Sequence, residues 1–371
     1  MTFRMHRREF NRITLGTAVA GSCGNLLRAD EQKDVPWLTE IQTPPAVLPK
    51  DTPVLKPLLI DSKGNAITNQ EQWAIRRKEL QQQWRSFLGR EIGPPDHRPK
   101  LEVMAEDRDA GVLRQHVRYE IEPGIFTEAY LVQPLRIQKK CPGVVVFHST
   151  VNHSISQPAG LGSDAEKAFG LKLAKQGVVT FSPRNFLWPD NQHIAANEET
   201  DRFQKRHPDS KGMAKMLYDA QVAVNILANI PGVDANRLGA VGHSLGAKEV
   251  LYLAAFDDRI QATVSSEGGI GTSFSNWDAQ WYLGPSIKEP GFELEHHELL
   301  AMVAPRAFLL IGGDSADGDR GWPFINAALP VYRLTSPLPR MGQYNHRKGH
   351  AVPPECEERI SQWFNAYLYD W

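Results

Sequence analysis

Short apolar runs alternate with longer amphipathic segments from residue 143 to the C-terminus. The runs are rich in Val, Leu and Ile, a composition typical of strands that are buried on both faces. In the segments between them, apolar residues recur every three or four positions, which predicts helices. Strands are expected at 143–147, 178–181, 238–241, 260–264 and 307–311, and helices at 165–176, 214–230, 247–256, 293–303, 323–334 and 354–367. This alternation predicts an α/β fold, with a mostly parallel sheet and helices on both of its faces.

Residues before 143 follow other patterns. Segments 113–121 and 126–132 are expected to be strands separated by a Pro-Gly turn, and they predict an antiparallel start to the sheet. Segment 69–87 places Trp and Leu at helical spacing among polar residues, which predicts an amphipathic helix. Residues 31–66 are rich in Pro and have no clear period. We therefore divide the chain into a signal-like segment, an N-terminal arm with its helix, and an α/β domain, at 1–30, 31–100 and 101–371.

The first thirty residues have the layout of an export signal, because a basic stretch precedes a weakly apolar run of small residues. Arg7-Arg8-Glu9-Phe10 resembles the twin-arginine signature of bacterial export, and a cut near Ala29 would fit. Ala20-Gly21-Ser22-Cys23 resembles a lipoprotein box without its usual leucine. Lipidation and an uncleaved, disordered N-terminus are the alternatives. We expect an exported protein, periplasmic or extracellular.

The predicted strand at 238–241 ends in Gly242-His243-Ser244-Leu245-Gly246, which has the form G-x-S-x-G. A helical pattern follows at once, and strand, tight turn and helix are the context of a nucleophile elbow. A side chain at either glycine would crowd a turn that closes a helix directly onto a strand. Ser244 should therefore stand at the carboxyl edge of the sheet, near the positive end of the following helix. This context favours a nucleophile over an incidental serine in a turn.

A serine hydroxyl needs a base to take its proton and a third group to orient that base. His350 lies on a loop just before the last predicted helix, which is the usual place of the base after a nucleophile elbow. His346 is the competing candidate and is otherwise expected to end a strand.

Two acids compete for the third role. Glu267 ends the predicted strand that follows the nucleophile helix, and Asp317 lies after the next strand, the commoner place for such an acid. Asp314 and Asp319 are weaker candidates on the same loop, and such an acidic run can equally be a solvated turn. One of the two main candidates would orient His350, and the other would help to hold the loops.

The oxyanion of an acyl-transfer intermediate needs backbone donors that are already in place. The N–H of Leu245 is one candidate, and the loop with Ser149 and Thr150 is the expected source of the second. Several aromatic and basic side chains fall at the predicted edge of the site and are candidates for contact with a substrate, although core packing or ion pairs with the loops would explain them as well. They are Trp188, Trp277, Trp281, Trp322 and Arg184.

Composition excludes several classes of function. The chain has 371 residues and a formal net charge of −1, which gives no electrostatic reason to expect nucleic acid as a partner. Its apolar runs are all shorter than the roughly 20 residues of a membrane-spanning helix. The sequence has no C-x-x-C or H-E-x-x-H spacing, and His296-His297 cannot both face one metal, so no metal site is expected. Cys141 and Cys356 are expected to be free and buried, with a disulfide between them as the alternative in an exported protein.

The elbow, the late His350 and the order of elements resemble the α/β-hydrolase superfamily over roughly residues 100–371. The chain is similar to dienelactone hydrolases and acetyl-xylan esterases among exported bacterial carbohydrate esterases, although dienelactone hydrolases have a cysteine in place of Ser244. Residues 267–271 and 297–306 are similar to segments of the glucuronoyl methylesterases. Lys248 matches the lysine four positions after their serine, whereas Leu245 replaces an arginine that assists their oxyanion.

These resemblances imply an α/β-hydrolase fold and a serine esterase that needs no cofactor. The implied substrates are acetyl or uronoyl esters of plant or algal carbohydrates, with Lys248 as a substrate-binding residue or only a lysine on the helix surface. A serine peptidase of the same fold is the alternative enzyme. A non-catalytic carbohydrate-binding protein that kept the fold is the alternative from another class.

Overall fold

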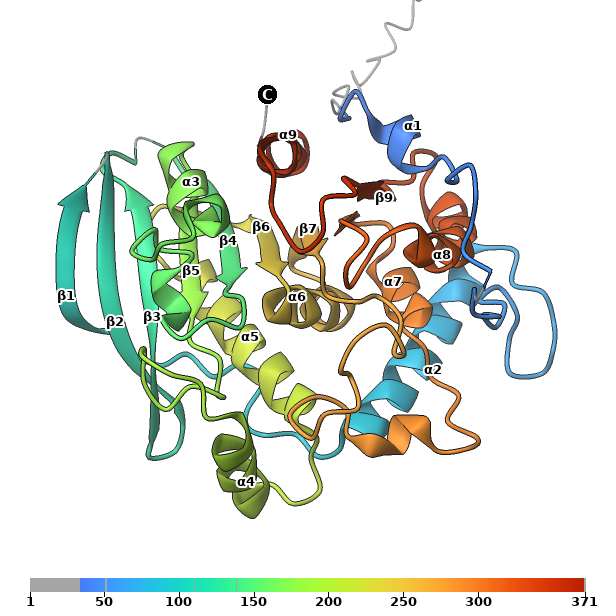
Figure 1. Cartoon of the computed structure of the whole chain (residues 1–371), viewed down its shortest axis with the longest axis horizontal. Helices are drawn as coiled ribbons and strands as arrows, with labels where there is room; N and C mark the ends of the chain where they lie inside the picture. Colours follow the sequence, from blue (N-terminus) through green and yellow to red (C-terminus); the bar gives the residue numbers. More distant parts are fainter. Residues whose placement is uncertain (1–33, 51, 110, 138, 370–371) are drawn as a thin grey trace, which may run out of the picture. The chain divides into compact units, whose positions relative to one another are not determined.

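The sheet that the apolar runs predict is present in the structure of the chain, a computed structural model that describes residues 34–50, 52–109, 111–137 and 139–369. Over these ranges, nine strands form one sheet in the order β1-β2-β3-β5-β4-β6-β7-β8-β9 (Figure 1). The strands are β1 (Glu102–Asp109), β2 (Val112–Glu122), β3 (Ile125–Pro134), β4 (Cys141–Phe147), β5 (Val179–Pro183), β6 (Val233–His243), β7 (Ile260–Ser266), β8 (Ala307–Gly312) and β9 (Met341–Asn345). The predicted export signal lies outside the described residues.

Strand direction divides the sheet into two parts. Strands β1, β2 and β3 are antiparallel to their neighbours, and β3 also pairs antiparallel with β5. From β5 through β4, β6, β7 and β8 to β9, all pairs are parallel. The predicted mostly parallel sheet with an antiparallel start is therefore confirmed. In the register of the parallel part, His243 pairs with Ser266, and Ser266 pairs with Ile311, so the carboxyl ends of β6, β7 and β8 lie side by side.

Helices cover both faces of the sheet, as the periodicity predicts. Helices α3 and α9 pack with apolar residues of β4, β6, β7 and β8 on one face. Helices α2, α5, α6, α7 and α8 pack on the other face in two further clusters. The helices are α1 (Leu38–Ile41), α2 (Gln70–Leu88), α3 (Phe169–Lys175), α4 (Ala196–Arg206), α5 (Gly212–Ala228), α6 (Leu245–Phe256), α7 (His297–Val303), α8 (Trp322–Thr335) and α9 (Pro354–Leu368). No helix in the described ranges is long and apolar enough to cross a membrane.

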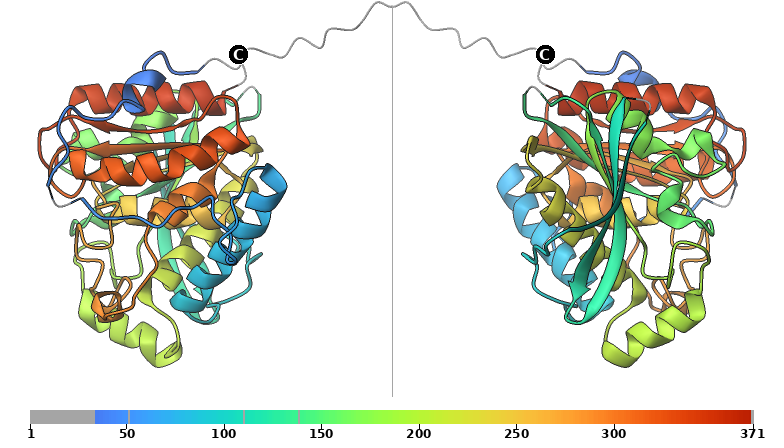
Figure 2. Two further views of the ribbon diagram at one scale, coloured as in Figure 1. Left: turned by 90° about the vertical axis from the view of Figure 1, so that its right-hand side faces the viewer. Right: turned by 90° about the vertical axis from the view of Figure 1, so that its left-hand side faces the viewer.

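The segment before the sheet belongs to the same compact unit as the sheet, since that unit begins at Asp34. Helix α2 buries Trp73, Leu80 and Trp84 in the cluster that also contains α7 and α8. Helix α1 lies beside β9, where Ile41 touches Gly342 and the side chain of Gln42 donates a hydrogen bond to the carbonyl of Met341 (3.1 Å). Figure 2 shows these helices gathered near the β9 edge (left) and the strands β1–β3 at the opposite edge (right).

Candidate active site

Ser244 lies between the last residue of β6 and the first residue of α6, with φ 59° and ψ −114°. This left-handed backbone is rare for a residue with a side chain and marks a sharply turned elbow. A Cβ atom at Gly242 would lie 2.2 Å from the backbone of Gly246, and one at Gly246 would lie 2.5 Å from the carbonyl oxygen of Phe147. Both glycines of the motif are therefore required sterically, as the sequence predicts.

Glu267 lies next to this elbow because their strands are neighbours. The N–H of Ser244 donates to the carbonyl of Ser266 (2.8 Å), and the N–H of Glu267 donates to the carbonyl of Ile311 (2.9 Å). Glu267 also has a positive φ, 58°. The two loops that carry the candidate nucleophile and acid thus begin side by side at the carboxyl edge of the sheet.

The carboxylate of Glu267 is buried and faces His350. Its oxygens accept hydrogen bonds from the N–H groups of Gly313 and Ala316, the second at 2.6 Å. Its Oε2 lies 3.3 Å from Nδ1 of His350. An ionised carboxylate can only accept, so Nδ1 of His350 carries the proton and Nε2 is the basic nitrogen of the neutral ring. This is the orientation that a general base beside a serine requires.

Asp317, the other candidate acid, has different partners. Its side chain is buried and accepts hydrogen bonds from the N–H groups of Gly269 (2.8 Å) and Ile270 (2.6 Å). Burial raises the pKa of Asp317 to about 6, an effect that these two backbone hydrogen bonds oppose. The hydrogen bond to the ring of His350 therefore comes from Glu267, whereas Asp317 binds the backbone of the loop after β7.

The remaining candidates for base and acid are engaged in the turn after β9. Nδ1 of His346 accepts a hydrogen bond from the N–H of Lys348 (3.1 Å), and burial lowers the pKa of this histidine. Asp314 and Asp319 each accept a hydrogen bond from the side chain of Asn345, at 2.7 and 2.8 Å, and form ion pairs with Arg347. These contacts join the exposed part of the loop after β8 to the turn after β9.

The expected oxyanion donors differ in availability. Leu245 is the first residue of α6, and its N–H belongs to the first turn, where helices leave N–H groups without internal partners. The N–H of Ser149 instead donates to Oε1 of Gln157 (2.8 Å), because this side chain folds back over the loop after β4. Thr150 is exposed. The expectation that Ser149 offers an unused donor is therefore corrected.

A buried polar chain next to the site was not predicted. The ring of His243 lies 4.6 Å from that of His350, and its Nδ1 is 3.1 Å from Oγ of Ser149. Nδ1 of His148 bonds to the carbonyl of Ser149 (2.8 Å), and its Nε2 accepts from the N–H of Asn185 (3.2 Å). Burial lowers the pKa of His148 to about 4 and that of His243 well below its ordinary value, so both rings are neutral. The sequence feature that could have pointed to this buried chain is the position of His243 directly before Ser244.

Two of the side chains expected to touch a substrate are buried. Nζ of Lys248 donates to the carbonyl of Gly268 (2.7 Å) and lies 3.9 Å from the ring centre of Trp277. Burial lowers the pKa of Lys248 to about 7. Trp277 is 1% exposed, and its Nε1 donates to the carbonyl of Gly269 (2.7 Å). Trp277 therefore packs in the core, the alternative given for it, and Lys248 is buried against the loop after β7 instead of lying on the helix surface.

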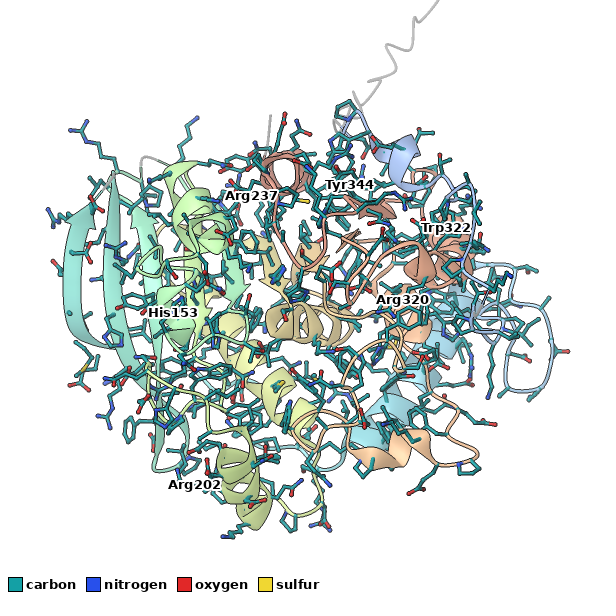
Figure 3. All side chains as sticks on the ribbon, in the orientation of Figure 1. His153, Arg202, Arg237, Arg320, Trp322 and Tyr344 are labelled. Carbon is teal, nitrogen blue, oxygen red and sulfur yellow. The ribbon has the colours of Figure 1, made fainter. Side chains whose placement is uncertain are left out.

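The other residues predicted to contact a substrate differ in how deeply they are buried. Arg184 is buried and pairs with Glu128 of β3 at 3.4 Å, so it binds an acid of the sheet and not a loop aspartate. Trp188 is buried and donates to the carbonyl of Val151 (2.9 Å). Trp322, labelled in Figure 3, is buried in the cluster with α8. Trp281 is half-buried and is therefore the most accessible of the tryptophans predicted to contact a substrate.

Within the described part of the chain, no group of three or more His, Cys, Asp or Glu side chains is arranged to hold a metal ion. Cys141 is half-buried and Cys356 is buried, and both are free thiols. The arrangement that remains is a strained serine, an imidazole held by a buried carboxylate, and backbone donors at a helix N-terminus. Such a set can transfer an acyl group through the serine.

Residues 127–289 match the dienelactone hydrolase family. Over 232 residues, the chain is 25% identical to a Bacillus subtilis (strain 168) protein named "Putative hydrolase YtaP", a match that covers 59% of this chain and 75% of that protein. A glucuronoyl esterase from Solibacter usitatus has a similar structure, with a TM-score of 0.67, 17% identity, and coverage of 85% of this chain and 98% of the other. A CE15 glucuronoyl esterase from Teredinibacter turnerae T7901 has a TM-score of 0.60 at 20% identity, with coverage of 83% and 88%.

Proposed function

We propose that this chain is a serine carboxylic-ester hydrolase, because it has the α/β-hydrolase fold and its residues 127–289 match the dienelactone hydrolase family. The observation that carries the proposal is the pairing of His350 with the buried carboxylate of Glu267, on the loop beside the elbow of Ser244. A non-catalytic protein that kept the fold would have no need to keep a strained serine and an oriented imidazole together.

In the proposed reaction, Oγ of Ser244 attacks the ester carbonyl while Nε2 of His350 takes its proton. Glu267 holds the ring and stabilises the imidazolium that forms. The N–H of Leu245 donates to the oxyanion of the tetrahedral intermediate. The imidazolium then protonates the leaving alcohol, and the acyl group stays on Ser244. Water, activated by His350 in the same way, releases the acid and restores the serine.

Esters of carbohydrates are the substrate class that we propose, with a uronoyl ester or an acetyl ester as the reacting group. The support is the likeness of residues 267–271 and 297–306 to glucuronoyl methylesterases, together with the fold shared with the Solibacter usitatus esterase. Lys248 and Trp277 are buried, so the sugar would have to contact other side chains. Trp281 is the accessible aromatic candidate.

The test is hydrolysis of p-nitrophenyl acetate, of a methyl glucuronate ester and of acetylated xylo-oligosaccharides by wild type, Ser244→Ala and Glu267→Gln. We expect Ser244→Ala to lose at least about a thousandfold in kcat and Glu267→Gln to lose about a hundredfold or more. Asp314→Asn is the matched control, because it makes the same kind of change on an exposed acid outside the proposed triad. Equal rates for wild type and Ser244→Ala on all three substrates would refute the proposal, and cleavage of peptides alone would favour a peptidase.

A further inference from the structure

The loops after β7 and β8 are joined by a reciprocal exchange of hydrogen bonds. Glu267, on the first loop, accepts from the N–H groups of Gly313 and Ala316 on the second. Asp317, on the second loop, accepts from the N–H groups of Gly269 and Ile270 on the first. Each loop therefore supplies the buried carboxylate that holds the backbone of the other.

Helix α6 adds a third contact to the same backbone. Nζ of Lys248, one turn after Ser244, donates to the carbonyl of Gly268 (2.7 Å). Gly268 lies directly against this helix, since a Cβ atom there would be 2.9 Å from Cβ of Ala247. Residues 268–270 are thus held by the amine of Lys248 from one side and the carboxylate of Asp317 from the other, an arrangement that we name the 268–270 clamp.

A fourth side chain ties the two loops together farther from the sheet. Arg320, labelled in Figure 3, donates to the carbonyls of Phe274 (3.0 Å) and Ser315 (2.8 Å). Its guanidinium lies 4.5 Å from the ring centre of Phe274. Phe274 is on the loop after β7 and Ser315 is on the loop after β8. The exchange of carboxylates is therefore part of a continuous set of contacts between the two loops.

The backbone at Glu267 needs such support. Its φ of 58° lies in the left-handed region, which a residue with a side chain occupies only when its surroundings impose it. Gly268, Gly269 and Ile270 are buried, so water does not reach their backbone groups to replace the hydrogen bonds of the clamp. Loss of the clamp would let this turn relax, and the carboxylate of Glu267 would move relative to His350.

We propose that Asp317 and Lys248 are positioning residues that act through residues 268–270 to hold Glu267 against His350. Lys248 and Asp317 are both buried, and they hold the two sides of one short loop, Lys248 as a donor and Asp317 as an acceptor. The importance of this geometry for turnover rests on the esterase function proposed above, whereas the clamp itself does not. Asp317 then has a defined role in the site without contact with the substrate.

The kinetic test compares Asp317→Asn with Asp314→Asn, two identical changes on one loop. An asparagine at 317 keeps one acceptor oxygen but turns an N–H group toward the second backbone N–H, so one hydrogen bond is replaced by a repulsion. We expect kcat of Asp317→Asn to fall at least about tenfold, while KM stays within about twofold. Asp314→Asn, whose side chain contacts Asn345 and Arg347, should stay within about twofold of wild type in both constants.

The structural test is amide hydrogen exchange in a peptide that covers residues 268–274. Exchange should be faster in Asp317→Asn than in wild type and unchanged in Asp314→Asn, because only the first variant removes a partner of these N–H groups. Wild-type kcat in Asp317→Asn, or a loss of kcat without faster exchange in this peptide, would overturn the clamp. If Asp317→Asn does not fold, Lys248→Met replaces it. Its kcat should fall, and exchange in the same peptide should be faster, because loss of the hydrogen bond to the carbonyl of Gly268 frees one side of this backbone.

The two proposals fail in different ways. If wild type hydrolyses none of the esters, the esterase function fails, and the exchange measurement still decides whether the clamp exists. If wild type is active and Ser244→Ala is inactive, but Asp317→Asn matches wild type in rate and in exchange, the clamp alone fails.

Discussion

A left-handed residue follows each of four neighbouring parallel strands. Ser244 after β6, Glu267 after β7, Asp314 after β8 and Arg347 after β9 have φ values of 59°, 58°, 66° and 58°. Glycine adopts this backbone without penalty, whereas other residues in unfavourable regions pay about 1–3 kcal/mol. At Ser244 and Glu267 the side chain is the one that the proposed chemistry uses. The chain therefore keeps a strained backbone at these two positions, where glycine would relieve the strain but would supply no reactive side chain.

Replacement of Ser244 by glycine tests this strain. We expect Ser244→Gly to be more stable than Ser244→Ala, with a free energy of unfolding about 1 kcal/mol higher. Relief of the left-handed strain should outweigh the greater conformational freedom of glycine in the unfolded chain. Both variants lack the hydroxyl of Ser244 and should have no esterase activity, so the difference between them reports stability alone. Urea unfolding at pH 7 supplies the measurement. A Ser244→Gly variant less stable than Ser244→Ala would show that the elbow carries no net strain.

Buried neutral histidines give the protein a sensitivity to acid. His296 is fully buried, with Nδ1 bonded to the carbonyl of Ile270 (2.9 Å) and Nε2 to the hydroxyl of Tyr252 (2.9 Å). Burial lowers the pKa of His296 from 6.5 to about 3. A group with a depressed folded-state pKa contributes its full stability above its unfolded value, so this contribution is complete above pH 6.5 and is lost progressively as the pH falls toward 3.

Substitution of His296 by glutamine isolates that contribution. Glutamine has a donor and an acceptor for the same two partners but does not titrate in this range. Between pH 7 and pH 5, wild type should lose about 2 kcal/mol of unfolding free energy relative to His296→Gln. The comparison of urea midpoints at the two pH values cancels the effects of other groups, among them Asp317, whose pKa burial raises to about 6. A constant difference between the two proteins would contradict a neutral, buried His296.

Among the secondary-structure elements, helix α2 shows how a segment before the sheet becomes part of its core. Trp84 is fully buried, donates from Nε1 to Glu298 of α7 (2.9 Å), and packs edge-on against Tyr252 of α6. Burial raises the pKa of Glu298 to about 7, and the hydrogen bond from Trp84 opposes that shift. Removal of the indole would therefore leave both a cavity and a buried carboxyl group without its donor.

We expect Trp84→Ala to lower the free energy of unfolding by about 3–5 kcal/mol, as large-to-small changes in well-packed cores do. Ile75→Ala on the same helix is the matched control: Ile75 is 63% exposed, and its loss should change stability by less than about 0.5 kcal/mol. Urea unfolding followed by circular dichroism measures both. Equal midpoints for Trp84→Ala and wild type would mean that α2 is not part of the cooperative unit.

The elements that the sequence pattern could not predict are those that bury little apolar surface. Helix α4 has the sequence ANEETDRFQKR and buries only Thr200 and Phe203. Strand β9 is five residues long, and only Met341 and Gly342 of it are buried. Hydrophobic periodicity needs a buried face to be visible, so it predicted the central strands and long helices but neither of these two. A strand before His346 was expected only as the alternative explanation of that histidine. The predicted helix at 165–176 is divided, because Ala168 separates a short 3₁₀ turn from α3.

At the scale of the whole molecule, the sheet edge on which the site lies could be predicted, but the contacts on that edge could not. Parallel strands bring Ser244 and Glu267, which directly follow β6 and β7, to one edge whatever the loops do, and the loop after β8 begins at the same edge. The choice between the two acids depended on how the loops after β7 and β8 cross, and the clamp at 268–270 is invisible in a pattern of residue types. For the same reason, Lys248 and Trp277 were expected at a surface that a long loop covers.

The two edges of the sheet differ in their protection, which bears on how the protein behaves at high concentration. Strand β1 is exposed along its whole length and carries five charged residues among its eight, a composition that discourages pairing with another strand. Strand β9 is instead covered by α1, through Ile41 and Gln42. A molecule that lost α1 would expose the β9 edge, while the charges of β1 would still discourage pairing at the opposite edge. The β9 edges of two such molecules would then pair with each other, and a contact between like edges closes as a two-fold dimer.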